Sequence, residues 1–171
     1  MSGYSELFYV MFAMIIFSVI LSNSNRLIHR NTTIQIEGEL EQEVVALGQE
    51  IIEEAQTKEF DEVTVGKELP PALIPGDFVG YGSLGPDGET SRQDYDDFDD
   101  YDGHSEVVKT AHGDFNIDVE VHYVDESTFA FTSSKSTFKK IVVTIKSEFL
   151  TDNSDQIKTY QLAFIRNYYA D

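Results

Sequence analysis

The chain has 171 residues, a formal net charge of −19 and no cysteine. The acidity excludes a nucleic-acid-binding surface, because a phosphate backbone is bound by clustered lysine and arginine, and the chain has only 12 of these residues. The lack of cysteine excludes disulfides, thiol catalysis and cysteine-ligated zinc. This length gives room for one globular domain and an appendage.

Residues 1–25 predict a transmembrane helix that also serves in assembly. Leu7–Leu21 contains no charged residue, and uncharged flanks extend the apolar stretch from about Tyr4 to Ser24, apart from Glu6. The 15 central residues would rise only about 22 Å as a helix, whereas a bilayer core is about 30 Å thick. A cleaved signal peptide, whose apolar region has a similar length, is the main alternative. A buried helix of a soluble protein is the other.

Residues 26–60 predict an amphipathic stalk helix. Apolar residues recur there every three or four positions, which places them on one helical face; they are Ile36, Leu40, Val44, Leu47, Ile51 and Ala55. Asn31-Thr32-Thr33 favours a hinge or a new helix start, because these residue types cap helices. Gly38 and Gly48 are expected to weaken the helix without ending it.

Residues 61–104 predict an irregular connection rich in Gly, Pro and Asp, and residues 105–171 predict an antiparallel sheet. Alternation of apolar and polar residues marks the strands, which are Val107–Ala111, Ile117–Tyr123, Lys139–Phe149 and Thr159–Tyr168. Short connections favour a meander. The C-terminal half of the stalk is the candidate cover for one face, so the predicted fold is α+β, a long N-terminal helix packed on a small antiparallel sheet head.

The acidic run Asp94–Asp102 is the densest group of candidate metal ligands. Carboxylate oxygens bind calcium, although the spacing does not match an EF-hand. Two interpretations stay open: a solvated acidic loop, and an irregular Ca²⁺ site built from Asp96, Asp97, Asp99, Asp100 and Asp102. Aromatic residues at three-residue spacing, Tyr95, Phe98 and Tyr101, indicate that one edge of the run packs inward.

Catalytic motifs are absent from the sequence, including the nucleophile elbow and the glycine patterns of phosphate-binding loops. We therefore expect a protein that is not an enzyme and that binds no small-molecule substrate. Apart from calcium, no cofactor is expected.

The order of these parts resembles that of type IV pilin-like proteins, a group that includes minor pilins and the pseudopilins of type II secretion. Val45–Phe60 (VALGQEIIEEAQTKEF), followed by Asp61, is similar to the end of the pilin helix. Asp96–Glu106 (DDFDDYDGHSE), the strand that ends at Tyr123-Val124-Asp125, and Lys140–Ile145 are similar to the heads of minor pilins. The resemblance covers most of the chain and implies a filament or pseudopilus subunit.

The resemblance also implies an assembly role for Glu6. Family members carry a glutamate at the fifth mature position, which is thought to pair with the terminal amine of a neighbouring subunit. Cleavage after Gly3 would put Glu6 at position three, whereas removal of Met1 alone would put it at position five. Both N-termini stay open, and so does the interpretation of Glu6 as an ordinary interfacial acid.

The expected location is a bacterial inner membrane, crossed once, with the head in the periplasm or outside the cell, or an assembled surface filament. The expected partners are the membrane and like or related subunits. By the positive-inside rule, Arg26, His29 and Arg30 would instead leave the C-terminal part in the cytoplasm. An accessory subunit of a larger membrane complex and a calcium-dependent adhesive domain are the alternative functions.

Overall fold

The computed structural model describes residues 3–67, 69–151 and 156–170. The chain divides into two units, Met1–Glu41 and Gln42–Asp171, and one helix, α1 (Gly3–Gln56), crosses the division. The C-terminal unit also contains four strands, which are β1 (Ser105–Thr110), β2 (Gly113–Tyr123), β3 (Phe138–Thr151) and β4 (Ile157–Asn167). The predicted α+β arrangement of a long apolar N-terminal helix and an antiparallel sheet is confirmed.

The N-terminal unit contains the apolar part of α1. By length and composition this helix can span a membrane: its most apolar 18-residue window has a mean hydropathy of 2.0, and the window is exposed. A signal sequence near an N-terminus has the same properties, so this alternative stays open. Met1 and Ser2, on which the two alternative N-termini depend, lie outside the described residues.

The helix continues without interruption through Asn31-Thr32-Thr33, so the predicted hinge or new helix start is wrong. The hydroxyl of Thr32 donates to the carbonyl oxygen of Ile28 at 3.0 Å, and that of Thr33 donates to the carbonyl oxygen of His29 at 3.1 Å. Both threonines bond to the preceding helical turn in this way, as threonines inside helices commonly do. They do not act as caps.

The sheet is an antiparallel meander with the strand order β1-β2-β3-β4. Apolar and polar residues alternate along the strands, which gives the sheet an inner apolar face. The buried apolar residues of this face in the two central strands include Phe115, Ile117, Val119, Val121, Ile141, Val143 and Ile145. The opposite face is mostly polar, as in a sheet with one face toward water. The predicted meander and its four strands are confirmed, with bounds that differ by a few residues.

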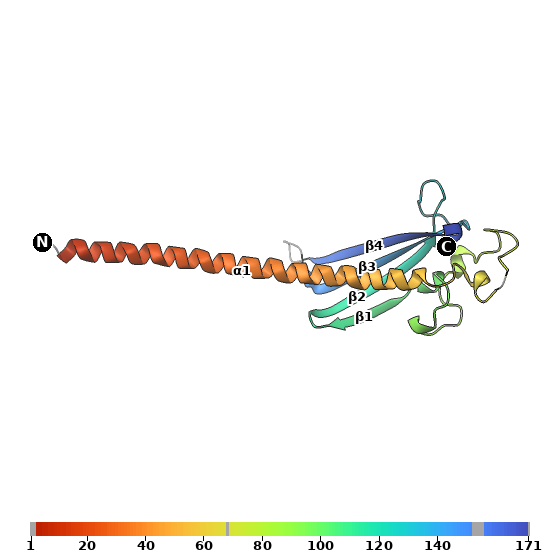
Figure 1. Cartoon of the computed structure of the whole chain (residues 1–171), viewed down its shortest axis with the longest axis horizontal. Helices are drawn as coiled ribbons and strands as arrows, with labels where there is room; N and C mark the ends of the chain where they lie inside the picture. Colours follow the sequence, from red (N-terminus) through yellow and green to blue (C-terminus); the bar gives the residue numbers. More distant parts are fainter. Residues whose placement is uncertain (1–2, 68, 152–155, 171) are drawn as a thin grey trace. The chain divides into compact units, whose positions relative to one another are not determined.

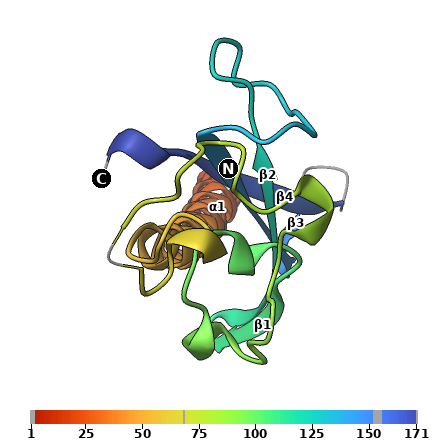
Figure 2. The same ribbon diagram turned by 90° about the vertical axis from the view of Figure 1, so that its right-hand side faces the viewer.

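Residues 42–56 of α1 run along the inner face of the sheet (Figures 1 and 2). Val44, Ile51 and Ala55 are buried there, which confirms that the C-terminal part of the predicted stalk covers the sheet. Gly48 lies where helix and sheet approach most closely: a Cβ at this position would lie 2.9 Å from Leu162 Cδ1 and 3.3 Å from Ile145 Cδ1. Its lack of a side chain therefore serves packing.

Replacing Gly48 should disturb this contact. We expect Gly48→Leu to lower the free energy of unfolding by about 1–3 kcal/mol, the usual effect of overpacking a core. Chemical denaturation of the full chain in detergent measures the change. Gly38→Leu in the same helix is the matched control, because a Cβ there meets no atom within 4 Å. Equal stability of the two variants would contradict the close approach of helix and sheet.

Candidate functional site

Helix α1 ends at Gln56, four residues before the predicted end at Phe60. The backbone groups of the residues that follow form hydrogen bonds with partners outside the helix. Arg166 Nη1 donates to the carbonyl oxygens of Lys58 and Glu59 at 2.6 and 3.2 Å. The amide of Glu59 donates to the carbonyl oxygen of Asp96, and the carbonyl oxygen of Glu59 accepts from the amide of Phe98. The end of the helix is thereby fixed beside the acidic run.

A row of polar residues crosses the inner face of the sheet next to this point. Tyr123 of β2 pairs with Lys139 of β3, which in turn pairs with Arg166 of β4. Lys139 is in phase with Ile141 and Val143, so the strand directs it inward, and its side chain is 0% exposed. Burying an ammonium group is costly unless acceptors surround it.

The ammonium of Lys139 has a partner for each of its three protons. Nζ donates to the carbonyl oxygen of Phe60 and to Asp61 Oδ2, both at 2.8 Å, and it contacts Asp99 Oδ1. The rings of Phe60 and Tyr123 lie 4.8 and 5.4 Å from Nζ, within the range of cation–π attraction. We refer to Asp61, Asp97, Asp99, Tyr123 and Lys139 as the Lys139 cluster.

The carboxylate of Asp61 joins the cluster to the irregular connection. It accepts from the amides of Val63 and Val79 at 3.3 and 3.2 Å. The hydroxyl of Tyr123 lies 3.2 Å from Asp61 Oδ2 and 2.9 Å from the carbonyl oxygen of Val79, and it can donate to either. These donors fix the position of the carboxylate.

Asp97 and Asp99 form the second acidic part of the cluster. Asp97 Oδ1 accepts from the amides of Asp99 and Asp100 at 2.7 and 3.1 Å. Burial, together with the charge of Asp99, raises the pKa of Asp97 to about 8. Burial raises the pKa of Asp99 to about 6, against the opposing effect of Lys139. Three carboxylates facing one ammonium leave excess negative charge, so the pair Asp97–Asp99 retains a proton at neutral pH.

The predicted calcium ligands divide into separate groups. Asp97 and Asp99 belong to the Lys139 cluster, and Asp102 Oδ1 accepts from the amide of Val121 at 2.8 Å. Asp96 and Asp100 lie with Glu89, which the sequence did not single out, and one carboxylate oxygen of each lies within 4.8 Å of the others. Such a group can offer oxygen ligands to a cation. Calcium binding stays a prediction.

The aromatic edge of the acidic run packs inward, as predicted. Tyr95, Phe98 and Tyr101 are buried, and the hydroxyl of Tyr101 donates to Glu54 Oε1 at 2.8 Å. Beside them, the guanidinium of Arg92 binds Glu54 and two further carboxylates, those of Glu50 and Glu106. These contacts attach the run to α1 and β1.

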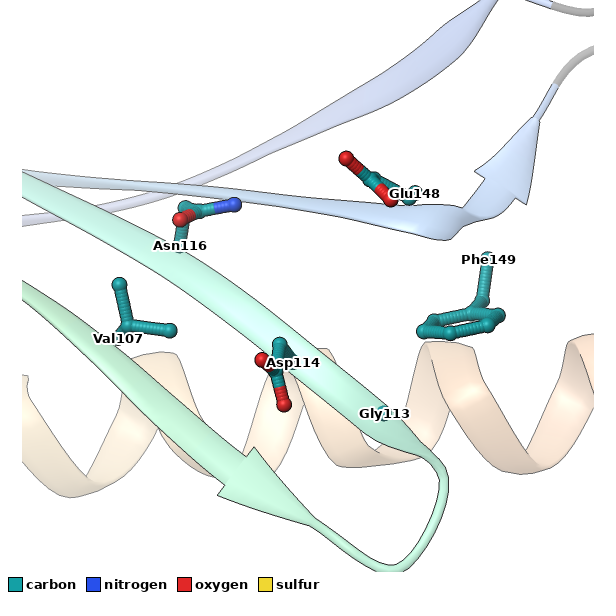
Figure 3. A pocket seen from close by; sticks show the side chains of 6 residues that line it. All are labelled: Val107, Gly113, Asp114, Asn116, Glu148 and Phe149. Atoms are coloured by element: carbon teal, nitrogen blue, oxygen red, sulfur yellow. The ribbon is translucent and has the colours of Figure 1, made fainter.

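A hollow of about 380 Å³ lies at the other end of the sheet, near the turn between β1 and β2 (Figure 3). Its lining residues are Val107, Gly113, Asp114, Asn116, Glu148 and Phe149. Phe149 lies against the backbone at Gly113: a Cβ there would be 2.3 Å from the ring, and φ is +136°, so glycine is required. The carboxylates of this hollow face solvent. It is therefore a weaker candidate site than the buried Lys139 cluster.

The sequence contained a signal for Lys139 that sequence reasoning missed. In Lys139–Ile145 the lysine occupies the same phase as three apolar residues, which marks a charged residue on the buried face. Arg166 follows Phe164 with the same period. Glu6 lies in the first turn of α1, inside the N-terminal unit.

No protein-family model, curated protein or solved structure matches the chain. The resemblance to pilin-like proteins rests on the sequence phrases given above and stays a prediction.

Removing the buried ammonium tests the Lys139 cluster. We expect Lys139→Met to lower the free energy of unfolding by about 3–5 kcal/mol, because the neighbouring carboxylates lose their partner. Denaturant unfolding of the full chain in detergent measures the loss. Lys146→Met, on the exposed face of the same strand, is the matched control and should change stability little. A Lys139→Met variant as stable as this control would contradict the role of Lys139.

The cluster should also make stability depend on pH. A carboxyl group whose pKa is raised by folding binds more protons in the folded than in the unfolded state, so stability falls as pH rises. With a folded pKa of about 8 for Asp97, against an ordinary value of about 4, the fall should lie between about pH 4 and pH 8. Thermal melting across this range measures it.

Asp97→Asn should flatten the upper part of this slope, because the amide does not titrate. Asp94→Asn, an exposed position in the same acidic run, is the control. A slope that persists unchanged in Asp97→Asn would show that Asp97 does not retain the proton.

Proposed function

We propose that this chain is a non-enzymatic structural subunit of a pilus-like filament or secretion pseudopilus, assembled through its apolar N-terminal helix. The observation that carries the proposal is α1, in which 54 uninterrupted residues lead from an apolar stretch to the helical cover of the sheet. As a helix, residues 4–24 rise about 30 Å, which equals the thickness of a bilayer core. The same segment can hold the subunit in a membrane before assembly and form part of the filament core afterwards.

The distribution of apolar side chains supports this use of the helix. Apolar side chains on different sides of α1 are 53–69% exposed, as in Phe8, Val10, Met11 and Ile20. A helix that is apolar on all sides needs apolar surroundings, which lipid or the helices of neighbouring subunits supply. Residues 42–56 differ, because their apolar stripe is covered by the sheet of the same chain. The assembly surface is therefore the N-terminal stretch.

Glu6 is the single charged residue of the first 25. A carboxylate inside an apolar environment is costly unless it pairs with a positive group. In the proposed assembly, a terminal amine of a neighbouring subunit supplies that group, as the resemblance implies. The subunit crosses the bacterial inner membrane once before assembly, with its sheet in the periplasm.

An assembly experiment in the source cells tests the proposal. Because the chain has no cysteine, a cysteine introduced at Ile16 reports helix–helix contacts between subunits without background. We expect disulfide-linked dimers of this variant in the membrane or filament fraction, and we expect Glu6→Ala to reduce them at least tenfold. Glu39→Ala, an acidic position farther along α1, is the matched control.

The outcomes separate the alternatives. Full assembly of the Glu6→Ala variant would remove Glu6 from the proposal. A membrane-bound chain that copurifies at fixed stoichiometry with unlike membrane proteins would identify an accessory subunit instead. A mature protein that begins after Ser24 would identify a cleaved signal peptide and overturn the proposal.

A further inference from the structure

The Lys139 cluster holds the side-chain nitrogen of a lysine in contact with a carboxyl group. Lys139 Nζ contacts Asp99 Oδ1, and both side chains are buried. The partners lie 40 residues apart in the chain and are brought together by β3 and the acidic run. Reacting groups that are fixed in a suitable geometry can reach effective molarities of roughly 10⁵–10⁸ M. Geometry therefore favours a reaction between them.

The surroundings of the pair exclude water. The rings of Phe60 and Tyr123 lie on the ammonium, and Phe98, next to Asp99, is fully buried. Charges in such a place lose their hydration, whereas a neutral amide loses much less. The exclusion of water also protects an amide from hydrolysis.

We propose that Lys139 and Asp99 form an intramolecular isopeptide bond, without an enzyme or an added reactant. The ammonium nitrogen gives up two protons and forms a bond to Cγ of Asp99. One carboxylate oxygen leaves Cγ with these two protons as water. One positive and one negative charge disappear together, and the remaining N–H of the amide can still donate to Asp61 or to the carbonyl oxygen of Phe60.

Asp97 carries the proton that this reaction requires. Its Oδ1 accepts from the amide of Asp99 at 2.7 Å, which places the two residues together, and burial keeps its carboxyl group protonated to about pH 8 by raising its pKa. It can therefore donate to the leaving oxygen and recover a proton from the amine. Asp99 rather than Asp61 is the partner, because the carboxyl group of Asp61 is held by other donors, the amides of Val63 and Val79 and the Tyr123 hydroxyl.

Mass spectrometry of the denatured full chain tests the bond. We expect the wild-type protein to weigh one water less than its sequence and Lys139→Arg to have the full mass. Trypsin does not cut after an acylated lysine, so Gln93–Lys109 should remain attached to Ser136–Lys140 as one branched peptide. Asp97→Asn should leave a larger fraction of molecules at the full mass.

A succinimide at Asp87-Gly88 or Asp102-Gly103 would also remove one water. Mild alkali opens a succinimide and restores the full mass, whereas it leaves an isopeptide bond intact. A wild-type protein at full mass, or a water loss reversed by alkali, would overturn the proposal. Complete cross-linking in Asp97→Asn would keep the bond and remove Asp97 as the proton carrier.

Discussion

When the chain folds, Lys139 is still an ammonium, and burying it is unfavourable unless acceptors surround it. These acceptors come from separate parts of the C-terminal unit. The turn after α1 supplies the Phe60 carbonyl and Asp61, and the acidic run supplies Asp99. A buried charge adds little net stability, but it penalises every arrangement that leaves it unpaired. This constraint gives the irregular connection a defined path, although it contains little regular structure.

Periodicity predicted the elements of the fold because it reports which face of an element is buried. The strand at Ile117–Tyr123 and the cover provided by residues 42–56 both follow from such patterns. The Lys139 cluster could not be predicted in full, since Asp61 and Asp99 are 78 and 40 residues from Lys139 and no spacing rule joins them. Charge density alone also could not distinguish the aspartates of the acidic run. Their backbone partners decide which of them face Lys139 and which face Glu89.

The two ends of the continuous helix α1 differ in how their apolar residues are distributed around the helix. Near its C-terminal end the apolar residues lie on one face of the helix, because the sheet covers only that face. Gly48 allows the helix to approach the sheet closely there. Near its N-terminal end the apolar residues point in all directions, so the surroundings must be apolar as well. The first pattern belongs to the folding of a single chain, and the second is that of a candidate membrane span or a signal sequence.

The order of these segments in the chain has a consequence for biosynthesis. The apolar stretch of α1 leaves the ribosome before any strand of the sheet has been made, because synthesis proceeds from the N-terminus. Lys139 and its carboxylates meet only after most of the chain has emerged. A ribosome still extending the sheet would therefore expose the apolar segment before the residues of the Lys139 cluster can meet.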